Sequence, residues 1–152
     1  MANHVRTQIR DAAVNLLDAL TTTSTRCTAA RPKSRPIQAS ELPCLIVYTN
    51  DTDTEMVSGT MPLRRKVNNC QLVVHGYAKG TGDIDATLDT IAKEVETALA
   101  ASPTLSGKCK DLYLTNTVKD SDPDAKQPTW ESVLTFTCEY ATREDIPDAA
   151  LA

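Results

Sequence analysis

Residues 128–142, PTWESVLTFTCEYAT, alternate between two kinds of side chain. One set is largely apolar and the other mostly polar, and this period of two predicts a strand with one packed face and one wet face. Both the Trp and the Phe of the chain fall in the apolar set, so the best hydrophobic material is placed in a sheet without an obvious reactive centre. The apolar set is Trp130, Ser132, Leu134, Phe136, Cys138 and Tyr140.

Four further stretches have strand character. The run 44–48, CLIVY, is apolar throughout, which predicts a strand buried on both faces and central in its sheet. Residues 64–78 form a long predicted strand, and residues 26–29 a short one. In the predicted strand 111–118, alternation places four side chains on one face. These are Leu112, Leu114, Asn116 and Val118.

Two segments show helical spacing of apolar residues. Residues 4–20 form one amphipathic pattern, for which Asn3 is the expected cap. The second runs from Ile84 until Ser102 and Pro103 stop it, because a residue before proline disfavours the helical region. Asp83 lies at the start of this helix, where a carboxylate interacts favourably with the positive end of the helix dipole.

The order of these elements indicates an α+β fold. Two helices with one apolar stripe each would pack on one face of a mostly antiparallel, or mixed, sheet. A chain of 152 residues buries about 68–70% of its unfolded surface. We therefore expect a single domain over residues 1–142, followed by a frayed tail over residues 143–152.

Two charged segments are expected to project. Residues 49–66 resemble a hairpin whose tip carries mostly polar and charged side chains, and residues 30–40 form a loop stiffened by proline. Their basic residues are either solvated loop charge or contacts with a neighbouring subunit or with DNA in an enclosed passage. The basic residues are Arg31, Lys33, Arg35, Arg64, Arg65 and Lys66.

Charge is distributed unevenly along the chain. Residues 1–76 hold nine Lys and Arg against six Asp and Glu, whereas residues 77–152 hold seven against 14. The net charge of −4 argues against general nucleic-acid binding through a basic surface. The asymmetry is either ordinary solvated surface or a pair of complementary patches between subunits.

Candidate chemistry is sparse. Asp120, Asp122, Asp124 and Glu131 have the spacing of a calcium loop, but Ala125 replaces the required glycine and the flanks are predicted strands. An acidic hairpin turn without an ion explains them, so no metal and no cofactor are expected. Five cysteines without a CxxC motif indicate buried thiols, and no apolar run suggests a signal peptide or a membrane span.

Four stretches in order resemble the tail terminator family of long-tailed phages, which includes minor tail protein U of phage lambda. They are HVRTQIRDAAVNLLDAL near the N-terminus, ELPCLIVYTND at 41–51, VVHGYAKG at 73–80 with the helix after it, and residues 111–142. The resemblance covers nearly the whole chain. The five cysteines and Trp130 depart from the family pattern.

The resemblance implies a protein that is not an enzyme. Members form a hexameric ring on the last ring of the tail tube protein, stop its polymerisation and offer a surface to the head connector protein. Genomic DNA passes through the channel without sequence-specific binding. The implied location is the head-proximal end of the virion tail, reached from the host cytoplasm during assembly, with no membrane involved.

The family's assembly surfaces are loops and hairpins, which correspond here to segments 31–37, 50–66 and 120–128. A head–tail joining subunit is the structural alternative, and a small enzyme or ligand-binding domain around His75 and Tyr77 is the alternative from another class. The candidate interface residues are Arg31, Lys33, Arg35, Asp51, Asp53, Glu55, Arg64, Arg65, Lys66, Asp120, Asp122 and Asp124.

Overall fold

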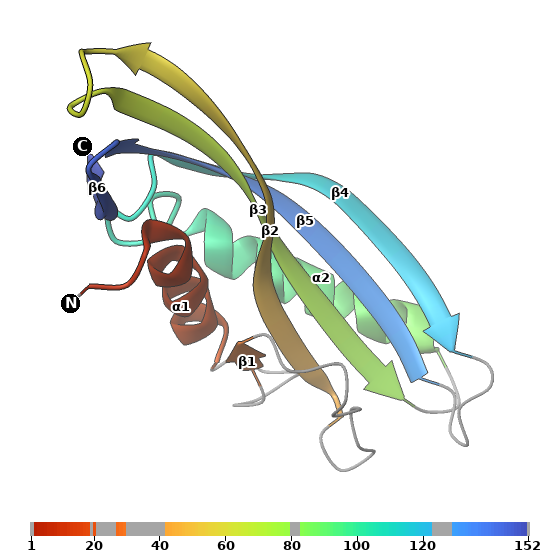
Figure 1. Ribbon diagram of the computed structural model, residues 1–152. Helices are drawn as coiled ribbons and strands as arrows, with labels where there is room; N and C mark the ends of the chain where they lie inside the picture. The colour runs from red at the N-terminus through yellow and green to blue at the C-terminus, as the bar shows by residue number, and fades with distance from the viewer. Residues whose placement is uncertain are drawn as a thin grey trace.

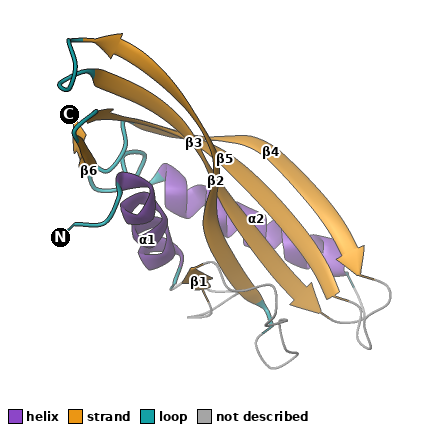
Figure 2. Cartoon of the chain, viewed as in Figure 1, coloured by secondary structure: helices purple, strands orange, loops and turns teal. Residues whose placement is uncertain are grey.

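The computed structural model describes residues 2–18, 20, 27–29, 42–79, 83–122 and 129–151. Along the chain, one helix is followed by three strands, and this order is then repeated (Figures 1 and 2). The α+β fold expected from the sequence is confirmed. In order, the elements are α1 (Val5–Leu17), β1 (Cys27–Ala29), β2 (Cys44–Ser58), β3 (Arg65–Lys79), α2 (Ile84–Ala100), β4 (Asp111–Asp122), β5 (Thr129–Arg143) and β6 (Ile146–Leu151).

All six strands belong to one sheet. Its order is β1-β2-β3-β5-β4, with β6 also paired to β5. The short pairing of β1 with β2 is parallel, and the other pairings are antiparallel. The expectation of a mostly antiparallel sheet is therefore correct, and β3 and β5 form its centre.

Both helices cover the same face of the sheet (Figure 1). Helix α1 is shorter than the predicted 4–20, and its cap is His4 where Asn3 was expected. The His4 Nδ1 atom accepts a hydrogen bond from the Arg6 backbone N–H at 3.1 Å. Asp83 lies at the start of α2 as predicted, and it also caps the helix, because Asp83 Oδ1 accepts from the Ala86 backbone N–H at 3.0 Å.

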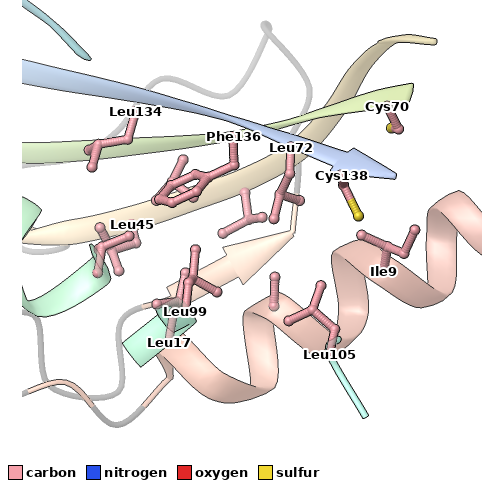
Figure 3. Close-up of a cluster of buried hydrophobic side chains, with 14 of the residues drawn as sticks. Ile9, Leu17, Leu45, Cys70, Leu72, Leu99, Leu105, Leu134, Phe136 and Cys138 are labelled. Atoms are coloured by element: carbon pink, nitrogen blue, oxygen red, sulfur yellow. The ribbon is translucent and has the colours of Figure 1, made fainter. Parts of the chain in front are cut away.

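The hydrophobic core lies between the helices and the sheet. In Figure 3, side chains of β2, β3 and β5 gather with those of α1 and α2 in one cluster. The helical residues of this cluster recur at the spacing that the sequence predicted. They are Val5, Ile9, Ala13 and Leu17 from α1, and Leu88, Ile91, Ala92, Val95 and Leu99 from α2.

Strand β5 has the predicted alternation over most of its length. Side chains from Ser132 to Tyr140 are buried at every second position, on the face beneath the helices. Trp130 is the exception, because 37% of its surface is exposed near the end of the strand. The face predicted for this Trp is correct, since Trp130 lies opposite the buried Ala78, but the expectation that it is packed there is not met.

Strand β4 departs from the simple alternation. A register shift between Leu114 and Asn116 adds one residue to β4, and the extra residue reverses the facing of all later residues in the strand. Leu112 and Leu114 lie opposite the packed residues of β5, whereas Val118 lies opposite Val133 on the other face. The prediction that Leu112 and Val118 share a face is therefore wrong.

The C-terminal residues after Arg143 form strand β6 instead of the frayed tail that was expected. β6 pairs with β5 through Ala141 opposite Leu151 and Arg143 opposite Ile146. Neither α1 nor α2, the helices within the described residues, combines the length and apolar character needed to span a bilayer.

Candidate assembly surfaces

The β2–β3 hairpin extends beyond the helices as a projecting arm (Figure 1). We call residues 53–66 the hairpin arm. Every residue from 53 to 63 is exposed, so the predicted projection is confirmed. The turn uses Gly59 at φ +96, where a Cβ would lie 3.1 Å from the Leu63 carbonyl oxygen. Glycine is needed here for both its backbone conformation and its lack of a side chain.

The tip of the arm is more apolar than the sequence analysis expected. Four large apolar side chains are exposed on it, with exposed fractions from 47% to 74%. Their signal was present in the sequence as apolar residues at a hairpin tip that has no packing partner. The four residues are Met56, Val57, Met61 and Leu63.

Arg64 is not a free interface charge. Its Nε donates to Glu144 Oε2 at 2.9 Å and its terminal nitrogen to Glu144 Oε1 at 2.7 Å. The Glu144 backbone N–H also donates to the Arg64 carbonyl at 2.8 Å, and the pKa of Glu144 is lowered mainly by the Arg64 hydrogen bond. Arg64 therefore ties the end of the arm next to its turn to the β5–β6 turn, a contact that the expectation of a frayed tail did not include.

The other charged residues of the arm lie along its two strands. Asp53 and Glu55 are exposed on β2, while Arg65 and Lys66 are partly buried at the start of β3. Asp51 belongs to β2.

Asp120, where the predicted acidic turn starts, lies at the opposite end of the sheet from the arm. Asp120 is exposed on β4 and lies opposite Glu131, which in turn lies opposite Tyr77. Tyr77 is 12 residues along β3 from Arg65, or roughly 40 Å at about 3.3 Å per residue. Asp120 and the charged side chains of the arm in one chain are therefore too far apart to neutralise each other.

Asp122 ends strand β4. The remaining predicted interface positions lie outside the described residues: Arg31, Lys33, Arg35 and Asp124. Among the residues that are described, no group of three or more His, Cys, Asp or Glu side chains is arranged to hold a metal ion. Among the residues whose side chains are described, four cysteines are buried and reduced: Cys44, Cys70, Cys109 and Cys138.

The sheet face turned away from the helices, which we call the open face, carries more carboxylates than basic groups. Among the residues whose side chains the structure describes, the strand register assigns six carboxylates and three basic residues to this face. The carboxylates are Asp53, Glu55, Asp111, Asp120, Glu131 and Glu139, and the basic residues are Arg65, Lys79 and Arg143.

His75 lies on the open face inside a polar cluster. Its Nε2 is hydrogen-bonded to the Tyr48 hydroxyl and its Nδ1 to Glu131 Oε1. The ring stacks on Tyr48 with centroids 4.9 Å apart, and the Tyr77 hydroxyl lies 3.4 Å from Nδ1. Both imidazole nitrogens thus have partners.

The ionisation of this cluster is set by its own contacts. The His75 hydrogen bond is the main cause that lowers the pKa of Glu131. Burial raises the pKa of Tyr48, with Glu131 adding to the shift, and burial likewise raises that of Tyr77. The Glu131 carboxylate is therefore hydrogen-bonded to the His75 imidazole, and the hydroxyl groups of Tyr48 and Tyr77 remain protonated. A polar cluster whose groups are hydrogen-bonded in this way is typical of a structural network.

Comparison with known proteins places the chain in a family. The sequence model of the family described as phage minor tail protein U matches residues 4–140. A chain of the solved structure titled "Virion of native gene transfer agent (GTA) particle" is similar over 90% of this chain and 92% of that chain, with 20% identity and a TM-score of 0.46. No curated protein sequence matches. Because the family match spans most of the sequence, the chain belongs to the phage minor tail protein U family and has a structural role in a phage tail.

Proposed function

We propose that the chain is the tail terminator, which caps the tail tube as a ring, stops its polymerisation and presents a docking surface to the head connector. The observation that carries this proposal is the family match over residues 4–140 together with an exposed arm whose tip is apolar. Exposed apolar patches of this kind mark interaction sites. A virion structural protein needs such a surface, whereas catalysis needs none.

The separation of unlike surfaces supports ring formation. A cyclic ring uses a head-to-tail interface in which two different patches of each subunit meet. The arm and the acidic end of β4 lie at opposite ends of the sheet, so each is available to a neighbouring copy. We infer a hexamer, with the tube protein below the ring and the connector above it.

The open face supports passage of the genome without sequence-specific binding. Nucleic-acid affinity comes largely from basic groups that neutralise phosphates, and carboxylates outnumber basic groups on this face. If the open face lines the channel, DNA would pass a surface that does not retain it. The protein would act at the head-proximal end of the tail after assembly in the host cytoplasm.

The test is a phage that lacks this gene, with the wild-type gene supplied in trans as the control. Electron microscopy of lysates should show abnormally long tails or tubes, and complementation should restore the normal length. Tails of normal length that fail to join heads would overturn the terminator proposal in favour of a head–tail joining subunit.

A further inference from the structure

Two edges of the sheet are unpaired along most of their length within the described ranges. Among the described residues, no strand lies beside the outer edge of β4 (Asp111–Asp122), which we call the β4 edge. On the other side, β1 pairs with β2 only from Leu45 to Val47. The outer edge of residues 49–58 is open beyond that point, and we call it the β2 edge. Such edges expose backbone donors and acceptors that can pair with another chain.

The lysine of β4 does not guard its outer edge, although the strand carries the bulge at Leu114 and Asn116 and the exposed carboxylates of Asp111 and Asp120. Lysine side chains often guard an edge strand, but Lys119 is turned toward α2 and forms ion pairs with Asp85 at 2.8 Å and Asp89 at 2.5 Å. Tyr113 and Val118 are instead exposed large apolar residues on this strand. The outer edge of β4 therefore offers a strand edge and apolar contact area to a second strand.

Strand directions make the two edges compatible. Because β2, β3, β5 and β4 are successive antiparallel neighbours, β4 runs opposite to β2. If two copies stand the same way up, the β4 edge of one meets the β2 edge of the next in antiparallel orientation. An antiparallel ladder is the more stable pairing, and the lengths agree, with 12 residues in β4 and ten in the open part of β2.

We propose that the β4 edge of one copy pairs with the β2 edge of a second copy of this chain, so that repeated pairing closes one continuous sheet around the ring. The proposal rests on the proposed ring function and specifies the contact between neighbouring subunits, the pairing of the β4 edge with the β2 edge, which we call the seam. Met56 and Val57 of one copy would lie along this contact with Tyr113 and Val118 of the next, with Met56 on the helix-side face and Tyr113 and Val118 on the open face.

The stagger of the two edges fits a closed sheet. The β4 edge lies beside the part of the sheet from Asn69 to Lys79 of β3, whereas the β2 edge lies beside the part from Arg65 to Leu72. When the β4 edge of one copy pairs with the β2 edge of the next, each copy is shifted along the strand direction relative to its neighbour. Tilted strands with this kind of shear are what closure of a barrel requires.

Two double variants test the seam by light scattering at matched high concentration. The β4 variant is Tyr113→Asp with Val118→Asp, the β2 variant is Met56→Asp with Val57→Asp, and Leu16→Asp on exposed α1 is the control. Each seam variant alone should be monomeric, with its dissociation constant raised by about 100-fold or more because charge is buried. The control should associate like the wild type.

Mixing the two seam variants gives the sharpest result. Each mixture partner keeps one intact edge, so an equimolar mixture should form heterodimers that cannot extend into rings. A β2 variant that still dimerises alone would show a symmetric β4–β4 contact and overturn the proposal. A wild-type chain that stays monomeric at every concentration would overturn it as well.

Hydrogen exchange on the wild-type protein avoids the risk that a variant misfolds. Association should slow amide exchange in residues 49–58 and 111–122 and leave α1 unchanged, whereas protection confined to the turn 59–63 would refute edge pairing. The tail-length phenotype is measured independently of these assays. The deletion phage could have overlong tails while both seam variants associate like the wild type. These two results together would reject the seam and retain the terminator function.

Discussion

Gly76 of β3 lies where α2 approaches the sheet, and its replacement by alanine should strain that contact. A Cβ at this position would lie 3.0 Å from Ile91 Cγ2 and 3.5 Å from Leu45 Cδ2. Overpacking of this kind costs about 1–3 kcal/mol, and the lower entropy of the unfolded Ala chain offsets about 0.4–1 kcal/mol of it. We expect a net loss of roughly 1–2 kcal/mol, or a fall in Tm of about 2–8 °C for a domain of this size.

A double-mutant cycle measured by urea unfolding identifies the cause. Ile91→Ala alone should cost about 2–5 kcal/mol, but it also removes the methyl group that an added Cβ would meet. Gly76→Ala should therefore cost less in the Ile91→Ala background than in the wild type, by about 1 kcal/mol. Gly107→Ala is the matched control, because φ is +82 there and nothing lies within 4 Å of the added Cβ. Its cost should be equal in both backgrounds. Strict additivity of Gly76→Ala and Ile91→Ala would refute the packing argument.

Three further outcomes are expected from single contacts. Leu134→Ala, in the centre of the core, should lower the free energy of unfolding by about 2–5 kcal/mol in urea titrations. Because the pKa of Glu131 is lowered in the folded state, its contribution is present above its unfolded pKa and is lost as pH falls through the lowered value. The stability gap between the wild type and Glu131→Gln should therefore close below about pH 4 in urea midpoints, and a constant gap would reject the His75 contact as its source. Arg64→Gln should speed amide exchange in the hairpin arm, and the exchanged pair Arg64→Glu with Glu144→Arg should restore the wild-type rate; no recovery would mean that the bridge does not anchor the arm.

The sequence predicted best those elements whose side-chain pattern matches one uniform period. Strand β5 alternates without interruption from Ser132 to Tyr140, and α2 keeps one apolar stripe, so both faces could be assigned before the structure was known. In these segments burial is a direct result of periodicity, because every packed residue contacts the same layer. The arm was predictable as a projection for the related reason that its residues form no stripe.

The errors arose where a neighbouring strand decides the outcome. The bulge at Leu114 and Asn116 depends on pairing with β5, and a one-residue shift moves each later side chain to the other face. Trp130 is partly exposed because it lies near the end of β5, a position that alternation does not distinguish from the centre. The Arg64–Glu144 bridge joins residues 80 positions apart, and local sequence gives no sign of such a contact.

The hairpin arm presents its apolar tip in a fixed direction. Strands β2 and β3 stay paired from beneath the helices into the arm, as far as Ser58 opposite Arg65, with register shifts between Thr49 and Thr52 and between Met56 and Ser58. The Arg64–Glu144 contacts fasten the same point to the β5–β6 turn. Because ordering a flexible loop on association costs free energy, an arm that is already ordered loses less on docking. A subunit that must stop a repeating assembly benefits from this arrangement, since its docking surface has to match one ring geometry before binding.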